Sequence, residues 1–373
     1  MIGLAASTLL LGAGEIMGAS GIISSFILNP KKALFDFDDS TAQDSWKRAY
    51  IASFCLCTLL VVQNDQHPVA IRILQGDQGI VDPKLVNLVK PSTIGYVISG
   101  FLVGMGTRLG NGCTSGHGIC GLARFSRRSL AAVVSFMLTG ILSASLCGPD
   151  CVFAKFLRTK SLEGNCPTNT SKTVANTIAL ISIASFGKSV MMSSKHFGKA
   201  YRLEKQFFAS FIKENAKKIS ASLSGALFSF GLAISTMIKP SKIVGFLDVT
   251  GLVKGTYDPT LLAVMGGGLG VSMMSYQAIK DYQVPFVAKH MPGLVKPPML
   301  CQRSSETKFS IPKNTIIDKQ LIAGSMLFGL GWGIGGLCPG PALYAGIAGI
   351  PNVLYYWWPG FIGGTFLGTS LKK

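Results

Sequence analysis

Charged residues are scarce in this chain. Asp, Glu, Lys and Arg make up only 14% of its 373 residues, whereas soluble domains average about 25%. Hydrophobic residues make up 48%, and the mean hydropathy is +0.43. This balance excludes an ordinary soluble domain and favours a membrane protein.

Acidic residues are scarcer than basic ones, with 17 Asp and Glu against 35 Lys and Arg, and the net charge is +18. The basic residues flank apolar segments and form no single patch with interleaved aromatic residues. They therefore indicate anchoring at a membrane surface and not a nucleic-acid partner. The sequence also lacks a nucleotide-binding loop and chains of intramembrane acids, which excludes an ATP-driven or proton-pumping device within this chain. The apolar start lacks the basic region of a cleavable signal peptide.

Long apolar stretches predict an all-α, polytopic membrane protein. Stretches of about 17–25 residues suit transmembrane helices. Nine are predicted, at residues 2–28, 48–63, 94–112, 129–147, 173–192, 221–239, 259–279, 321–338 and 352–371. The basic segment 193–220 predicts a cytoplasmic loop. Strict alternation then gives a multi-pass protein of the cell membrane, with its N-terminus outside and its C-terminus in the cytoplasm.

Glycine is abundant and gathers in two motifs. The chain has 44 glycines, where a usage of about 7% would give roughly 26. One glycine-rich run ends at Cys113 and another ends at Cys338, 225 residues later. At this offset Gly104, Gly106 and Gly110 align with Gly329, Gly331 and Gly335. Such glycines also serve close helix packing in membranes, but their repetition indicates a duplicated membrane protein.

A second match supports the duplication. The segment Ala19-Ser-Gly-Ile-Ile23 is similar to Pro240-Ser-Lys-Ile-Val244 at an offset of 221. Predicted helices one to four therefore correspond to helices six to nine, in opposite orientation, as in transporters built from inverted repeats. We divide the chain into a first repeat (1–147), a linking segment with an outer loop, a linker helix and a basic cytoplasmic loop (148–220), and a second repeat (221–373).

Each motif cysteine is predicted to lie between two half-helices. Thr114 or Ser115 is suited to cap a new helix after Cys113, and proline suits the first turn of a new helix after Cys338. Unpaired N–H groups at such helix starts favour an anion. A neutral thiol adds a weak, polarizable donor. Together these features favour a small sulfur-containing anion as the ligand.

The other cysteines suggest different readings. Cys113, His117 and Cys120 have a C-x3-H-x2-C spacing that also suits a soft metal ion. A fourth ligand would be needed and no histidine lies near Cys338, so we expect no metal and no other cofactor. The remaining cysteines are expected to be structural or free: Cys55 and Cys57 in an apolar helix, Cys147, Cys151 and Cys166 around the outer loop, and Cys301 in a cytoplasmic loop. A disulfide in the outer loop would need an oxidising compartment.

Ionisable residues are few within the predicted spans, and two of them are candidates for a functional role. Glu15 either lines the path, where it would bind a coupling cation, or forms a hydrogen bond with a neighbouring helix. Arg108 either attracts an anion towards Cys113 or extends to the cytoplasmic interface, and we expect the interface.

These residues carry a resemblance to a known family. The run Asn111-Gly-Cys-Thr-Ser-Gly-His-Gly-Ile-Cys-Gly-Leu-Ala-Arg-Phe-Ser-Arg-Arg-Ser129 closely resembles the signature of the YeeE/YedE sulfur-transport family. The segments 231–248 and 329–341 are similar to the partner half of that family, so both halves are expected to be fused in this chain. The resemblance covers nearly the whole chain except the region around 148–220.

The resemblance implies a transporter, not an enzyme, that takes up thiosulfate or a related sulfur anion past Cys338 and then Cys113. It also implies a small sulfur-accepting cytoplasmic protein as a partner, beside the lipid bilayer. Some family members use a further cysteine near the first helix, where this chain has Ser20. The candidate substrate-binding residues are Cys113, Cys338, Thr114, Ser115, Gly112, Gly340, Ser20 and His117.

The same residues are also compatible with two alternative functions. A membrane sulfurtransferase would form a persulfide on Cys113 and would need His117 as its base. A soft-metal transporter would use the C-x3-H-x2-C residues.

Overall fold

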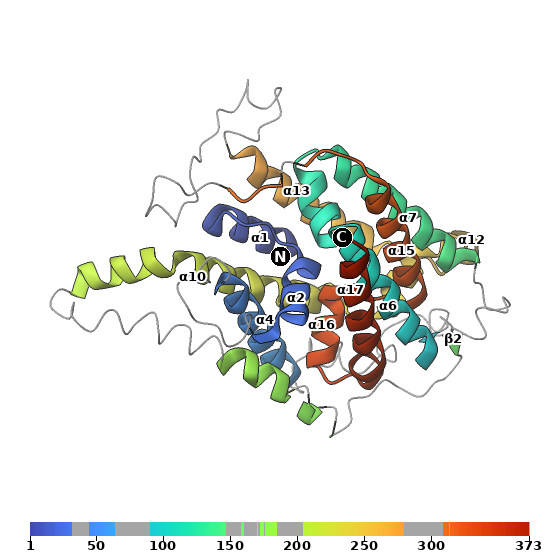
Figure 1. Cartoon of the computed structure of the whole chain (residues 1–373), viewed down its shortest axis with the longest axis horizontal. Coiled ribbons are helices and arrows are strands. Elements are labelled where there is room, and N and C mark those ends of the chain that lie inside the picture. Colours follow the sequence, from blue (N-terminus) through green and yellow to red (C-terminus); the bar gives the residue numbers. More distant parts are fainter. Residues whose placement is uncertain are drawn as a thin grey trace.

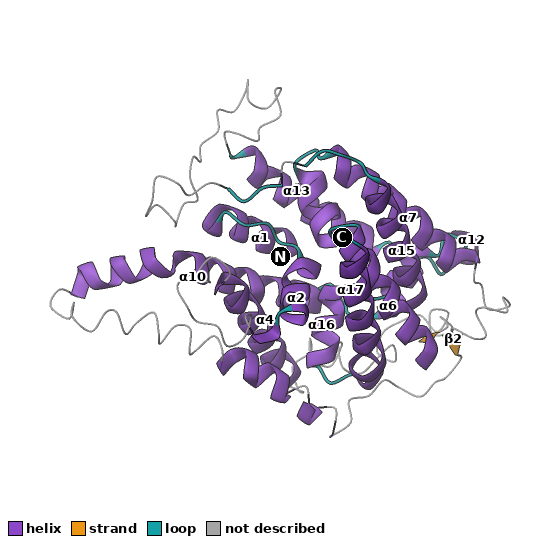
Figure 2. Cartoon of the chain, in the orientation of Figure 1, coloured by secondary structure: helices purple, strands orange, loops and turns teal. Residues whose placement is uncertain are grey.

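The computed structural model describes residues 1–31, 45–63, 90–146, 158–159, 170, 172–174, 176–184, 204–279, 309–312 and 314–372. Helices form nearly all the regular structure in these residues (Figure 2). The exception is one short antiparallel pair, β1 (Lys90–Pro91) with β2 (Arg158–Thr159). The prediction of an all-α protein is confirmed.

The first half of the chain contains a series of helices interrupted by breaks. In chain order they are α1 (Ile2–Thr8), η1 (Leu9–Ala13), α2 (Ala19–Leu28), α4 (Ser45–Gln63), α6 (Thr93–Leu109), η4 (Thr114–Gly121) and α7 (Arg127–Leu146), where η marks a π-helical turn. The predicted spans 48–63, 94–112 and 129–147 coincide with α4, α6 and α7. The predicted span 2–28 is not one helix, because the chain turns out of η1 at Gly14, whose φ is 72°.

The second half follows the same plan. Its helices are α10 (Glu204–Ile234), α11 (Pro240–Leu247), α12 (Gly251–Lys254), α13 (Thr260–Gln277), α15 (Lys319–Gly335), α16 (Pro339–Ile347), η6 (Val353–Trp357) and α17 (Trp358–Leu371). Each predicted span of this half contains helical residues. The predicted span 173–192 lies partly outside the described residues.

Few of the described helices are long and apolar enough to cross a membrane alone. By length and composition, two pass among the described residues, Ser45–Gln63 and Arg127–Ser145. A third crossing results if α15 and α16, which meet at an angle of 41°, count as one broken span. Among the described residues, Ile2–Ala13 and Ala19–Leu28 are shorter apolar helices.

An apolar stripe marks the outer face of the bundle. Leu130, Val134, Leu138 and Leu142 follow one another every fourth residue along α7, and each is about half exposed. Residues four apart lie on one face of a helix. An exposed row of this kind is a liability in water but suits contact with lipid. With the composition and the helical architecture, it identifies a polytopic membrane protein.

Helix contacts repeat between the two halves. α6 packs against α17 as α15 packs against α7, and α4 packs against α10 as α1 packs against α13. Likewise α2 contacts α17 as α11 contacts α7. The two 17-residue helices α6 and α15 also pack on each other (Figure 1). Exchanging one half for the other reproduces the pattern, as in a two-fold arrangement, which supports the predicted repeats.

The contact between α6 and α17 depends on glycine. A Cβ atom added at Gly364 would collide with the carbonyl oxygen of Phe101 on α6. At the neighbouring Gly363, an added Cβ would lie 3.9 Å from the Phe101 ring, which is an ordinary contact. Small residues let membrane helices approach at backbone distance, where packing replaces the hydrophobic effect.

This difference gives a matched pair of variants. We expect Gly364→Ala to destabilise the protein by about 1–3 kcal/mol, because the two backbones must separate. Gly363→Ala should be neutral or stabilising by up to about 1 kcal/mol, since alanine favours the helix. Thermal unfolding of the purified protein in detergent measures both, and equal melting temperatures would contradict this account of the contact.

Candidate functional site

Cys113 lies at a helix break made by a left-handed residue. α6 ends at Leu109, and Asn111 adopts a φ of 60°, which asparagine tolerates better than most residues. Cys113 is then extended and caps η4. The hydroxyl of Ser115 lies 3.2 Å from Cys113 Sγ and accepts a hydrogen bond from the Ala19 N–H at 3.2 Å. The start of α2 therefore holds the hydroxyl that orients this thiol.

Cys338 lies at the equivalent break in the second half. α15 ends at Gly335, and Gly336 has a φ of 63°, at an offset of 225 from Asn111. A side chain at Gly336 would also collide with the backbone of Pro240, the first residue of α11. Cys338 is extended and caps α16. The predicted half-helix pairs are thus present on the described residues of both halves.

The two cysteines lie on one small cavity, which we call the thiol cavity. The Thr114 hydroxyl of the first half donates to Cys338 Sγ of the second at 3.6 Å. The cavity has a volume of about 50 Å³. Its polar lining is contributed by Cys113, Thr114, Ser115, Cys338 and Trp332, and Gly340 and apolar side chains complete it. Five of the predicted site residues are therefore together here.

Trp332 is a lining residue that the sequence reasoning missed. Its ring stacks on Phe328 and meets Phe136 edge-on, with centroids 6.0 and 5.9 Å away. Its indole N–H is buried and has no hydrogen-bond partner among the described residues. A buried unpaired donor beside a cavity suggests a ligand acceptor. Its position inside the glycine motif, between Gly331 and Gly333, is the sequence feature that could have identified it as a site residue.

The three other predicted residues line a different cavity. Ser20, Gly112 and His117 face a space of about 150 Å³, which we call the arginine cavity because Arg108 and Arg124 also line it. His117 is fixed there, with Nε2 3.0 Å from the Gly110 carbonyl and Nδ1 3.1 Å from the Ser129 hydroxyl. A Cβ at Gly112 would lie 2.7 Å from the His117 ring, so the two pack tightly.

Three lining residues of the two cavities occupy equivalent positions of the two repeats. Trp332 and Pro341 of the thiol cavity stand 225 residues after Thr107 and Gly116 of the arginine cavity. Met237 of the thiol cavity stands 221 residues after Ile16 of the arginine cavity, which is the offset of the second sequence match between the repeats. Part of the lining is therefore equivalent between the two cavities, although residues of both breaks line the thiol cavity, and the two cavities differ in chemistry.

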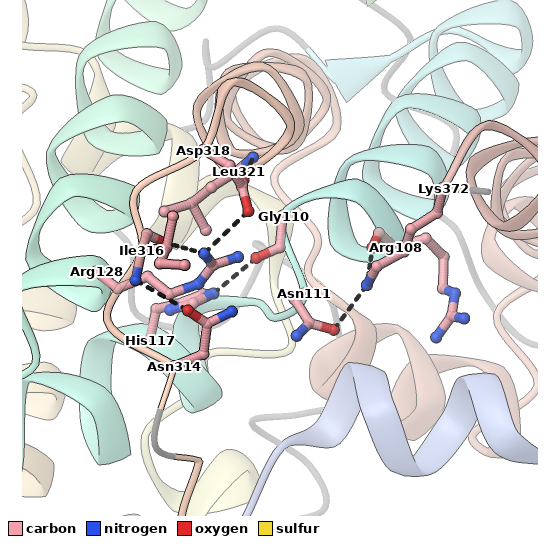
Figure 3. A network of polar contacts seen from close by, with 10 residues as sticks. All are labelled: Arg108, Gly110, Asn111, His117, Arg128, Asn314, Ile316, Asp318, Leu321 and Lys372. Carbon is pink, nitrogen blue, oxygen red and sulfur yellow. Dashed lines mark hydrogen bonds and ion pairs between the residues drawn. The ribbon is translucent and has the colours of Figure 1, made fainter.

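A polar network braces the first break (Figure 3). Arg128 binds the Ile316 carbonyl and forms an ion pair with Asp318 at 3.1 Å. Lys372 donates to the Arg108 carbonyl at 3.1 Å and to Asn111 Oδ1 at 2.9 Å. A hydrogen bond from the Leu321 N–H, together with the Arg128 guanidinium, holds the pKa of Asp318 below its ordinary value. The Arg128 contacts tie α7 to the segment before α15, and the Lys372 contacts tie the end of α17 to the turn that precedes Cys113.

The residues of the alternative metal site have separate partners. Cys120 Sγ donates to the Met17 carbonyl at 3.5 Å, while Cys113 and His117 make the contacts above. Within the described ranges, no group of three or more His, Cys, Asp or Glu side chains could hold a metal ion. Cys55 and Cys57 are free thiols. The remaining cysteines lie outside the described residues: Cys147, Cys151, Cys166 and Cys301.

Glu15 and Arg108 have defined contacts. Glu15 lies in the break between η1 and α2 and forms an ion pair with Lys217 of α10 at 2.6 Å, which matches the neighbouring-helix alternative. Arg108 Nε donates to the Thr369 hydroxyl of α17 at 3.0 Å while the side chain lines the arginine cavity.

Comparison with known proteins agrees with this architecture. A family described as Sulphur transport matches residues 82–142, around the first break. A family of unknown function, DUF6691, matches residues 216–295 and 300–365 of the second half. The two matches fall in the two predicted repeats.

Curated relatives in Xylella fastidiosa are named as probable transporters. One, in strain Temecula1, is 35% identical over 136 residues, which cover 36% of this chain and 78% of the relative. Its counterpart in strain 9a5c is 35% identical and is covered to 79%. A different Temecula1 protein is 52% identical over 52 residues, which are 14% of this chain and 38% of that protein. The chain therefore belongs to the YeeE/YedE-type sulphur-transport family of membrane transporters, with two of its parts fused.

Proposed function

We propose that this transporter takes up thiosulfate, or a related small sulfur-containing anion, through the thiol cavity. The observation that carries the proposal is the hydrogen bond from Thr114 to Cys338, which joins the two helix breaks at one cavity. A neutral thiol presents a polarizable sulfur and a weak donor to the ligand. This chemistry suits the terminal sulfur of thiosulfate better than it suits an all-oxygen anion.

The oxygen atoms of the anion need stronger donors than thiols. The first turn of α16 supplies few of them, because Pro339 and Pro341 lack N–H groups and only Gly340 between them has one. Trp332 lines the same cavity and its indole N–H has no partner among the described residues, so we assign it as the donor that fills this deficit. On the other side, η4 begins at Thr114 and presents further N–H groups.

Transport then proceeds by exchange of contacts, with no covalent bond formed or broken. The anion enters at Cys338, shifts to Cys113, and leaves through the arginine cavity on the other side of the break. Sites of moderate strength in series allow both entry and release. The arginine cavity lies next to Arg124 and Pro312, which belong to the basic segments that predict the cytoplasmic side, so we place the exit there and the N-terminus outside.

The sulfurtransferase alternative needs a base beside Cys113. His117 is the candidate, but its two ring nitrogens are engaged by Gly110 and Ser129, and its ring faces the arginine cavity. The described contact of Cys113 Sγ is the Ser115 hydroxyl, which is not a base. This arrangement favours passage of the anion over persulfide chemistry.

Labelled thiosulfate uptake tests the proposed path. In cells that express equal amounts of protein, we expect Cys113→Ala and Cys338→Ala each to lower uptake at least about tenfold, as loss of a contact to a charged ligand does. Cys57→Ala is the matched control, because this free thiol lies outside both cavities. Full uptake by both cavity variants would refute the path, and no uptake by the wild type would refute the substrate.

Trp332 allows a test of the oxygen contact. Trp332→Phe keeps an aromatic ring against Phe328 but removes the N–H, so we expect the KM for thiosulfate to rise about tenfold. Trp357→Phe is the control, because its indole N–H is also buried without a described partner but does not line the cavity. If the two variants changed the KM equally, Trp332 would have no direct role in binding.

A further inference from the structure

We infer that the arginine cavity is a second anion site, which binds a small sulfur oxyanion such as sulfate through its oxygen atoms. The inference rests on the proposed function only for the place of this site on the transport path. Its evidence is independent of the thiols, because no cysteine is among the residues that line the cavity.

Ser24 provides the first observation. Its side chain lines the cavity and is 1% exposed, yet its hydroxyl has no hydrogen-bond partner among the described residues. A buried hydroxyl without a partner is energetically costly, so native proteins rarely keep one without a reason. A hydroxyl can donate and accept hydrogen bonds, and an anion in the cavity would accept a hydrogen bond from the Ser24 hydroxyl.

Arg124 provides the second observation. Its Nη1 donates to the Pro312 carbonyl at 3.0 Å, which fixes the guanidinium at the cavity wall. Its Nε is buried and lacks a partner in the described part of the chain. Arg108 adds another positive charge, and the lining residues include no carboxylate. A guanidinium with an unused N–H is suited to the oxygen of a sulfate-like group.

The start of α2 completes the set of donors. Ile22 makes the first backbone hydrogen bond of this ten-residue helix, to the Gly18 carbonyl. The N–H groups of Ser20 and Gly21 come before it and therefore have no partner within the helix. An added Cβ at Gly18 would meet nothing within 4 Å, so space remains beside this helix start. The partial positive charge of a helix N-terminus adds to that of the arginines.

The two cavities therefore differ in the part of the ligand that they contact. The thiol cavity offers soft sulfur atoms and one indole donor, whereas the arginine cavity offers hydroxyl, guanidinium and backbone donors without a thiol. An anion without a terminal sulfur should still bind the arginine cavity. Sulfate is therefore the probe that separates the two sites.

Calorimetric titration of the purified full-length protein in detergent with sodium sulfate, at ionic strength held constant with chloride, tests the inference. We expect sulfate to bind the wild type, and Ser24→Ala and Arg124→Gln each to weaken binding about tenfold. Arg124→Lys should lose less than Arg124→Gln, because it keeps the charge. Cys113→Ala and Cys338→Ala should bind sulfate like the wild type.

Matched controls exclude a general effect on folding. Ser25→Ala removes a hydroxyl from the same helix that is bonded to the Ile22 carbonyl, and Arg127→Gln removes a nearby exposed charge. Both should bind sulfate as the wild type does, and Ser24→Ala should melt no lower than the wild type without sulfate, because the hydroxyl that it removes has no partner among the described residues. Absent sulfate binding, unchanged binding in Ser24→Ala and Arg124→Gln, or a loss of binding in Cys113→Ala would overturn the inference. Failure of thiosulfate uptake would instead overturn the proposed function and leave the sulfate result standing.

Discussion

A helix that ends inside an apolar protein leaves backbone groups without partners, and the two helix breaks of this chain both meet that constraint. Water is scarce there, so each exposed N–H must find a side chain or a ligand. The chain meets it by turning at Asn111 and Gly336 and starting a new half-helix at a cysteine. The thiol cavity and the arginine cavity lie beside these helix breaks.

The two halves share a scaffold but not its chemistry. Thr107 and Gly116 of the arginine cavity are replaced at the equivalent positions of the thiol cavity by Trp332 and Pro341. The arginine cavity is therefore the more polar of the two, and the thiol cavity is more aromatic and apolar. Identical hollows would hold an anion equally on both sides of the breaks. On the proposed path, this difference would give the anion contacts with sulfur first and contacts with oxygen donors second.

The sequence was sufficient for the features that repeat along the chain. The offset between Cys113 and Cys338 predicted two helix breaks, because glycine, asparagine and proline have strong local preferences. It was insufficient for Trp332 and Ser24, since an unpaired buried donor is defined by neighbours that are distant in sequence. The break at Gly14 was also missed, because apolar residues on both sides of it read as one continuous span. Gly112 and His117 line the arginine cavity and not the thiol cavity, because sequence proximity to Cys113 does not determine which side of the break a side chain faces. Ser20 also lines the arginine cavity, and its place there depends on how α2 packs, which the sequence alone does not specify.

The hydrogen bond between Thr114 and Cys338 has a consequence for how such proteins are assembled. Neither half alone forms the thiol cavity, since residues of both halves line it and Thr114 of the first half donates to Cys338 of the second. Separately made halves would have to find each other in the bilayer and join one to one before this cavity existed. A single chain removes that search, because the tether keeps the local concentration of the second half high and its stoichiometry fixed.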